Sequence, residues 1–243
     1  MNNKVFFLAC ASMLTVFAPP TSMAADQHEC LVEPAVVLVL SSPVAGVIQS
    51  IGVGRGDRVW RGQTLVKLHA GSEQAAVELA QAKLEFSARE VKRAEELFRE
   101  NFTSEYSVDE ATTTAKLAEV ELKQAEAILA QKTLTSPISG VVVQRLAQVG
   151  ESVGNDEILR LAQINPLHIE VVLPVDQLNT VTEGMGATIY PQAPFGGEYS
   201  AKVQTVDNVI DAASGTFGVR LKLKNPGNKI PAGLRCKVSF NPE

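Results

Sequence analysis

A seven-residue repeat of apolar side chains runs through the charged segment from Ser72 to Lys132. Helices with this repeat pack along one face against a partner helix, and small side chains in the repeat let the two backbones approach closely. The first positions of the repeat are Val77, Leu84, Val91, Phe98, Val108, Ala115, Leu122 and Leu129, and the small fourth positions are Ala80, Ser87, Ala94, Ala111, Ala118 and Ala125. The only break is Asn101–Ser104, so the two arms are expected to fold onto each other as an antiparallel hairpin.

The ends of both arms carry capping signals. Ser72 is expected to cap the first helix, and Ser107 with Glu110 is expected to form a capping box at the start of the second. An arm of about 28 residues would be roughly 42 Å long. A hairpin of this length has no globular core of its own, so it must project from another domain.

The two segments that flank the hairpin resemble each other. Ser42–Leu68 and Ser136–Leu161 align when one is shifted by 94 positions, and each reads as short strands separated by glycine turns. The matching pairs are Pro43 with Pro137, Gly46 with Gly140, Val47 with Val141, Gly56 with Gly150, Asp57 with Glu151, Val59 with Val153 and Leu65 with Leu159. Each half is too small to bury a core alone, so a pseudo-symmetric β domain with the hairpin inserted in it is predicted.

The rest of the chain is also expected to be β structure. Glu29–Leu40 is a mostly apolar run that leads into the first half-repeat, and after Asn165-Pro166 the apolar side chains alternate from Leu167 to Leu173. Strands that follow predict a small antiparallel barrel or sandwich at 167–241. The expected class is mixed but mainly β, with an α-helical coiled-coil hairpin. The expected divisions are a signal peptide at 1–25, an N-terminal strand at 26–41, a two-part β domain at 42–71 and 133–165, the hairpin at 72–132 and a β-barrel at 166–243.

The first 25 residues have the pattern of a secretory signal. Lys4 provides the positive start, Val5–Ala18 the apolar run, and Ser22–Ala25 a small-residue cleavage site. A lipoprotein signal at Cys10 is the weaker alternative, because the apolar stretch before it is short. The apolar run is also short for a membrane span. An exported protein, attached to a membrane only through partners, is therefore expected.

Two cysteines, Cys30 and Cys236, lie near opposite ends of the expected mature chain. Export places them in a compartment that permits disulfides. If both ends belong to the same β domain, a bridge between them is feasible. Two unpaired small core residues are the equally weighted alternative.

Neither charge nor motifs point to catalysis or to nucleic acid. The net charge of −5 does not favour nucleic-acid binding. Gly52, Gly54 and Gly56 are read as turn glycines because no helix follows them, and the common hydrolase, metalloprotease and phosphate-loop motifs are absent from the sequence. The three histidines are scattered over the chain. No enzyme activity, no cofactor and no metal site is expected.

The split β halves (SPVAG and SPISG), the coiled-coil hairpin between them and the closing segment SGTFGVRLKLKNPGNKIPAGLRCKVSF together resemble periplasmic adaptor subunits, also called membrane fusion proteins (HlyD-like family). The resemblance covers nearly all of residues 30–241. It implies a split lipoyl-like, or barrel-sandwich hybrid, domain and a barrel. It also implies a periplasmic link between an inner-membrane transporter, of the resistance–nodulation–division (RND) or ABC type, and a TolC-type outer-membrane channel. Such links serve efflux of small molecules or secretion, and the resemblance further implies a homo-oligomer of six copies.

Adaptors that dock on TolC-type channels resemble one another at the hairpin tip. Arg93, Leu97 and Ser104 have the spacing of that motif, and both Arg93 and Leu97 lie off the apolar seam. The resemblance therefore implies that these three residues contact the channel; an ordinary solvated helix surface is the alternative.

The sequence departs from the family pattern after the barrel. Many adaptors of RND pumps continue into a membrane-proximal domain, which is expected to be absent because this sequence stops at Glu243. Two other functions remain as alternatives. One is a stand-alone periplasmic scaffold, and the other is a lipoyl or biotin carrier, disfavoured because the carrier's lysine-bearing turn is replaced by the hairpin.

Overall fold

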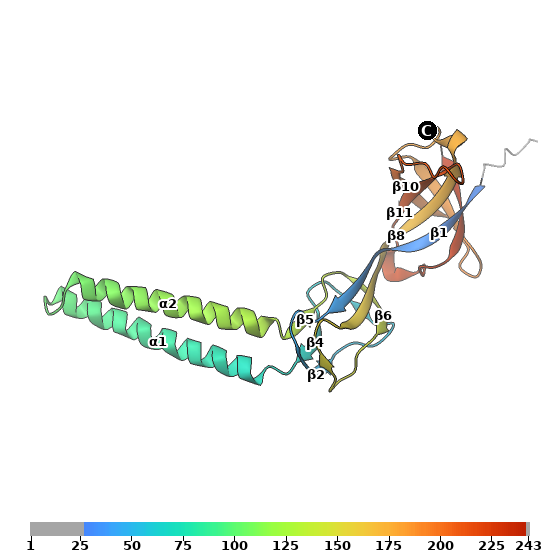
Figure 1. Cartoon of the computed structure of the whole chain (residues 1–243). Coiled ribbons are helices and arrows are strands. Elements are labelled where there is room, and N and C mark those ends of the chain that lie inside the picture. The colour runs from blue at the N-terminus through green and yellow to red at the C-terminus, as the bar shows by residue number, and fades with distance from the viewer. Residues whose placement is uncertain (1–26, 242–243) are drawn as a thin grey trace, which may run out of the picture.

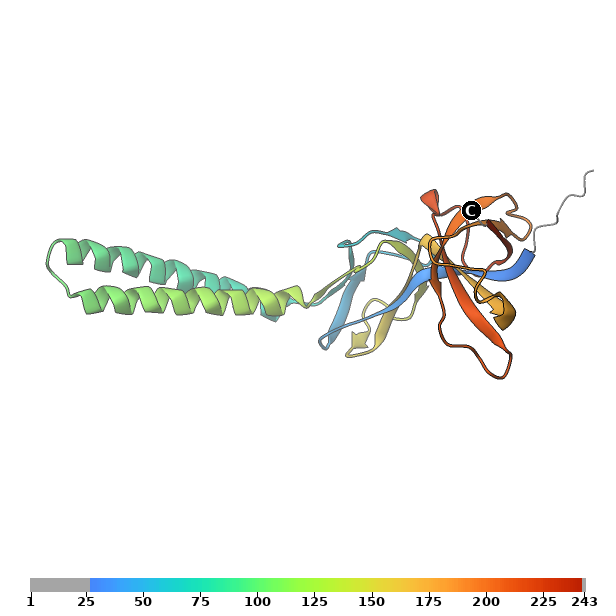
Figure 2. The same ribbon diagram turned by 90° about the horizontal axis from the view of Figure 1, so that it is seen from above.

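The computed structural model describes residues 27–241, which form three parts arranged in a row (Figures 1 and 2). A helical hairpin forms one end, a small β domain lies in the middle, and a β-barrel forms the other end. The predicted class, mixed but mainly β with a helical hairpin, is confirmed. The predicted signal peptide lies outside the described residues. Within those residues, no helix is long and apolar enough to cross a membrane.

Twelve strands and two long helices make up the described chain, together with two short 3-10 turns. The strands are β1 (Gln27–Ser41), β2 (Gly46–Ile51), β3 (Arg58–Val59), β4 (Thr64–Leu68), β5 (Thr133–Thr135), β6 (Gly140–Arg145), β7 (Ser152–Val153), β8 (Glu157–Pro174), β9 (Gly186–Pro191), β10 (Tyr199–Val206), β11 (Thr216–Leu223) and β12 (Arg235–Asn241). The helices are α1 (Gly71–Arg99) and α2 (Glu105–Ala130), and the 3-10 turns are Val175–Gln177 and Pro226–Asn228.

The barrel consists of six antiparallel strands in the order β1-β12-β9-β10-β11-β8, and it is closed because β1 also pairs with β8. Alternation along each strand decides which side chains fill it. In β8 the predicted alternating residues Leu167, Ile169 and Leu173 are fully buried, whereas Val172 between them is exposed. Closure removes the free strand edges that an open sheet would present to other chains.

Two long strands join the barrel to the middle domain. β1 and β8 pair from the barrel into the small β domain, with a register shift between Pro34 and Val36. The predicted boundary at Asn165-Pro166 therefore lies inside β8, which continues through it as one strand. The barrel and the middle domain are connected by a continuous two-stranded ribbon (Figure 1).

The middle domain is built from the two half-repeats, and each half completes the other. β2 pairs with β7, and β3 pairs with β6. These pairings are equivalent under the shift of 94: Gly46 lies opposite Val153, and Gly140 lies opposite Val59. The hydrogen bonds repeat as well, since the Ile48 N–H donates to the Glu151 carbonyl and the Val142 N–H to the Asp57 carbonyl, both at 2.9 Å.

The core of this domain draws on both halves. Ile48, Val59, Leu65, Val142 and Leu161 are among its buried side chains. Neither half brings enough of them to form a core alone, which agrees with the pseudo-symmetric domain expected from the repeat.

The hairpin has the expected seam. Ser87, Ala118 and Leu122 are buried between α1 and α2. The other predicted seam residues of both helices, apart from Phe98, are half-buried. Phe98 departs from the expectation because it lies in the last turn of α1, where the second helix is only beginning, and its side chain is exposed.

The expected caps were wrong at both helix starts. α1 begins at Gly71 with Ala70 at the N-cap position and no side-chain cap, while the Ser72 hydroxyl donates to the Glu73 carboxylate. α2 is capped by Ser104, whose hydroxyl oxygen accepts the Ser107 N–H at 3.4 Å. Ser104 precedes Ser107 in an equally good capping position, so the helix starts three residues earlier than predicted.

Candidate interaction surface on the helical hairpin

The turn between the helices is short and well hydrogen-bonded. α1 ends where Asn101 adopts a left-handed conformation with φ of 62°, and the Phe102 N–H donates to the Leu97 carbonyl at 2.8 Å. A left-handed residue after the last turn is a common way to satisfy the free carbonyls at the end of a helix, and asparagine tolerates it. Ser104 then starts α2. The tip is therefore a fixed local structure.

The three residues implied by the family motif all lie at this tip. Arg93 and Leu97 are one turn apart on α1, and Ser104 lies across the turn at the start of α2. The Arg93 guanidinium pairs with Glu90 at 2.7 Å and remains exposed. The Leu97 side chain is 40% exposed. Ser104 has a structural task as the cap of α2, which is a second reason for a serine at this position.

Two aromatic side chains at the tip were not singled out from the sequence. Phe102 is 76% exposed and Tyr106 is 74% exposed. Burying exposed apolar surface of this size is favourable, by roughly 25 cal/mol per Å². The available signal was compositional: two aromatic residues fall within five positions of a chain that is only 5% aromatic.

The base of the hairpin is anchored by one lysine. The Lys132 ammonium pairs with the Glu73 carboxylate at 3.1 Å and donates to the Ala45 carbonyl at 3.1 Å. It thus ties the start of α1 and the end of α2 to the middle domain. The pKa of Glu73 is lowered by its own backbone N–H and then by Lys132. These contacts fix the orientation of the hairpin relative to the middle domain.

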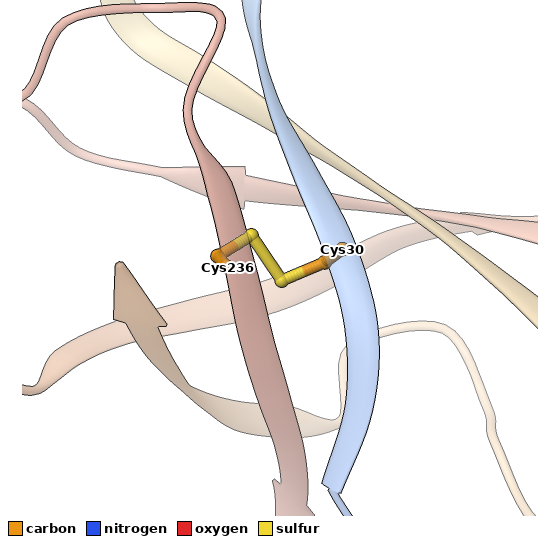
Figure 3. Close-up of a disulfide and its surroundings, with 2 residues drawn as sticks. All are labelled: Cys30 and Cys236. Carbon is orange, nitrogen blue, oxygen red and sulfur yellow. A yellow bond between two sulfur atoms is a disulfide. The ribbon is translucent and has the colours of Figure 1, made fainter. Parts of the chain in front are cut away.

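The barrel end carries a disulfide and a shallow hollow. Cys30 on β1 and Cys236 on β12 lie directly opposite each other and are bonded, with their Cα atoms 4.8 Å apart (Figure 3). An open hollow of about 950 Å³ lies over the same strands. Its lining includes Glu29, Glu170, Tyr190, Arg235 and Lys237. The bridge joins the first and last strands of the barrel below a surface of mixed charge.

No group of three or more histidine, cysteine or acidic side chains that could hold a metal ion occurs among residues 27–241.

Two family models match the chain. A CzcB-like barrel-sandwich hybrid domain matches residues 36–163, and a CusB-like β-barrel domain matches residues 166–243. The first match includes the hairpin, and the division between the two falls at the cis peptide bond Asn165-Pro166.

Curated relatives include an uncharacterized protein of Haemophilus influenzae, 24% identical over 95% of this chain and 63% of its own length. The efflux pump periplasmic linker BepD of Brucella suis is 24% identical over 78% of this chain and 56% of its own length. The multidrug resistance protein MdtA of Xenorhabdus bovienii is 23% identical over 82% of this chain and 54% of its own length. The chain thus spans less than two thirds of the length of these relatives.

Solved structures agree in fold. A MacA–MexA chimeric protein carrying the Pseudomonas aeruginosa MexA α-hairpin superposes with a TM-score of 0.75 at 19% identity, covering 89% of this chain and 78% of that one. A putative efflux transporter from Bacteroides eggerthii gives 0.72 at 17% identity, covering 93% and 73%. With its split β domain, inserted hairpin and closed barrel, the chain belongs to the periplasmic adaptor, or membrane fusion protein, family.

Proposed function

We propose that the protein is a periplasmic adaptor that links an inner-membrane transporter, of the RND or ABC type, to a TolC-type outer-membrane channel for efflux of small molecules or secretion. Several copies, six in the simplest arrangement, stand side by side with their hairpin tips toward the channel. The observation that carries this proposal is the exposed tip trio Arg93, Leu97 and Ser104 at the end of a rigid hairpin.

The hairpin is suited to reach a partner at a distance. α1 has 29 residues, which corresponds to roughly 43 Å. Its base is held by Lys132, so that the tip is presented in a defined direction. A small anchor such as Leu97 beside a charged Arg93 is typical of contact points between helical surfaces. Any effect on channel opening must come from contacts that differ between the closed and open states.

The barrel offers the surface for the transporter. The hollow over β1, β9 and β12 has basic Arg235 and Lys237 and acidic Glu29 and Glu170 at its rim. Mixed charges of this kind favour orientation and selectivity in a transient contact. The disulfide beneath fixes the strands that carry them.

Substitution of Leu97 tests channel docking directly. Leu97→Asp is expected to abolish channel-dependent efflux and co-purification of the channel, because a charge replaces the apolar anchor. Val120→Asp is the matched control: Val120 is also an exposed apolar residue of the hairpin, but it lies far from the tip. Full transport by Leu97→Asp, or equal loss in both variants, would contradict the docking assignment.

A test of Ser104 in docking needs a substitution that still caps the start of α2. Asparagine caps helices as well as serine does, so Ser104→Asn keeps α2 intact while enlarging the side chain at the tip. Lower efflux with unchanged helix content is expected. If the chain acts instead as a stand-alone scaffold, none of these variants alters transport and no channel co-purifies.

A further inference from the structure

The chain has one tryptophan, Trp60, and its side chain is 63% exposed on the surface of the middle domain. It directly follows β3, in which Val59 is buried in the core and Arg58 is exposed. Because side chains alternate along a strand, Trp60 lies on the same outer face as Arg58. An indole and a guanidinium are thus neighbours on this surface.

The turn before β3 is repeated in the second half of the domain. The Gly54 N–H donates to the Asp57 carboxylate at 2.7 Å, and 94 positions later the Gln148 N–H donates to the Glu151 carboxylate at 2.7 Å. The strand pairings beside the two turns follow the same shift. The fold therefore builds the same backbone frame twice.

The side chains on the two frames differ. Residues 54–63 carry three arginines and one aspartate, whereas residues 148–157 carry three acidic side chains and no basic one. Since the second half forms the same turn without them, the fold does not require the basic and aromatic side chains of the first. Those side chains and their counterparts are Arg55 and Val149, Arg58 and Ser152, Trp60 and Gly154, and Arg61 and Asn155.

Two of the arginines are held in place by main-chain carbonyl groups. The Arg58 Nη2 donates to the Gly227 carbonyl of the barrel at 2.8 Å, and the Arg61 Nε donates to the Pro137 carbonyl at 2.8 Å. A guanidinium has five N–H donors, so each side chain keeps further donors for a ligand. Because these side chains are already oriented, binding costs less conformational entropy.

The positive charges of this turn have no internal partner. Among residues 27–241, no ion pair includes Arg55, Arg58 or Arg61. Asp57, the one acidic residue of the turn, already accepts a main-chain N–H. The arginines are therefore free to attract an anion from outside.

The arginines lie where the middle domain meets the barrel. Arg58 reaches the loop between β11 and β12, in which Lys224 and Lys229 lie on either side of Gly227 along the chain. The net charge of the whole chain is −5, so this junction differs in sign from the protein as a whole. A local excess of positive charge concentrates anions near it, and ligand sites are common where two domains meet.

We propose that Arg58, Trp60 and Arg61 form a binding site for a small organic anion with a flat ring, an aromatic carboxylate. A carboxylate accepts two parallel hydrogen bonds from a guanidinium, and a flat ring stacks on the indole. The site is open to solvent, so the binding is weak, with a Kd of about 1–10 mM. This inference goes beyond the proposed adaptor function, because it gives the protein a ligand of its own.

The acidic turn of a second copy is a poorer occupant of this site. Asp156 and Glu157 would pair with the arginines, but the residues next to them, Gly154 and Asn155, offer little apolar surface to the indole. Val149 is exposed but lies seven positions before Asp156, at the other end of the turn. An aromatic carboxylate satisfies the charge and covers the ring together.

The single tryptophan provides a direct reporter of this site. The purified protein gives one indole N–H signal in a nitrogen–proton correlation NMR spectrum, and that signal belongs to Trp60. Benzoate at neutral pH and low salt should shift the signal in a saturable way, with a Kd of about 1–10 mM. Benzamide, which has a similar shape but no charge, and benzamidine, which is positively charged, should shift it at least about fivefold less at equal concentration.

Replacement of either guanidinium should weaken the binding. Arg58→Gln and Arg61→Gln are each expected to raise the Kd for benzoate at least about threefold, because a charge-assisted hydrogen bond is lost. Arg145→Gln is the matched control: Arg145 is an exposed arginine of the same domain that bonds to Gln148 of the second turn. It should change the Kd less than about 1.5-fold. Circular dichroism and the urea midpoint verify that all three variants remain folded.

The contribution of the indole is measured from the ligand. The fluorine NMR signal of para-fluorobenzoate broadens when the ligand binds, and Trp60→Leu should reduce this broadening at least about threefold because the stacking surface is lost. Unchanged broadening would overturn the assignment of Trp60.

Three further outcomes would overturn the proposal. They are equal shifts with benzoate and benzamide, no saturable shift up to about 50 mM benzoate, and equal weakening by Arg145→Gln and Arg58→Gln. An indole signal that moves with protein concentration in the absence of benzoate would assign the surface to a second copy instead. Neither the ligands nor the variants involve the hairpin, so this test and the channel-docking test can fail independently.

Discussion

The middle domain and the barrel, together called the base, use their apolar side chains in the opposite way to the hairpin. In the base, leucine, isoleucine and valine residues from distant strands are buried in two compact clusters. In the hairpin, only Ser87, Ala118 and Leu122 are buried, while large apolar side chains stand in solvent along both helices and at the tip. Burial in the base stabilises the fold. The apolar surface left on the hairpin is available for contacts with other chains.

The largest expected effect separates two equivalent glycines of the base. An added Cβ at Gly140 would lie 2.1 Å from the Ala162 carbonyl oxygen, which is backbone and cannot move aside alone. Gly140→Ala should therefore cost about 3 kcal/mol or more in free energy of unfolding. At Gly46 the nearest atom is the Leu68 Cδ1 at 3.2 Å, so Gly46→Ala should cost about 1 kcal/mol or less. Equal denaturant midpoints for both variants would contradict this account.

A pair of leucine truncations compares the two regions directly. Leu161 is fully buried in the base, and Leu122 is the most buried leucine of the hairpin seam. Leu161→Ala should lower the free energy of unfolding by about 3–5 kcal/mol. Leu122→Ala should cost about 2 kcal/mol, because a two-helix seam leaves a smaller cavity and can collapse around it. Urea unfolding followed by circular dichroism measures both; a larger loss for Leu122→Ala would reverse the comparison.

Removal of the disulfide should affect the base and spare the hairpin. The bridge joins residues 206 positions apart, so the chain without it gains conformational freedom when unfolded. The double variant Cys30→Ala, Cys236→Ala should lose about 2–4 kcal/mol of stability. Hydrogen exchange should rise in β1 and β12, while the rates in α1 and α2 stay unchanged. Reductant serves as the control, since it should mimic the double variant and have no further effect on it.

The smallest expected effect concerns the two ion pairs that Glu119 forms on the surface of α2. Lys123 and then Lys116 lower the pKa of Glu119 to about 2. A carboxylate with a depressed pKa contributes stability that is present above its ordinary value of 4.5 and is lost as the pH falls toward 2. In low salt, the helix signal of Glu119→Gln should change less over this pH range than that of the unmodified protein. Because Glu119 is exposed, salt should remove the difference.

Much of the architecture could be predicted from the sequence because its signals are local or repeated. The seven-residue spacing identified Ala118 and Leu122 as seam residues, and the shift of 94 positions located both halves of the middle domain. Alternation from Leu167 to Leu173 predicted a strand of the barrel correctly. The positions of the caps were predicted less well, because Ser104 and Ser107 are both good caps and only the folded turn decides between them.

The positions of the candidate site residues can be compared with the structure, while their contact with a channel stays a prediction. Arg93, Leu97 and Ser104 were found by their spacing, and the structure places all three at the tip. Phe102, in the turn, and Tyr106, at the start of α2, were missed because an aromatic residue reads equally well as a core residue until its surroundings are known.

The sequence by itself determined the order of the parts, the helical hairpin and the twofold repeat, since each depends on residues close together or on a repeat visible along the chain. Only the tertiary structure decided that each half-repeat pairs with strands of the other half, and that β1 and β8 run through both β domains. It also decided that Phe86 and Leu117 of the hairpin stay exposed. These are contacts between distant residues, and many pairings satisfy the same local pattern until packing selects one.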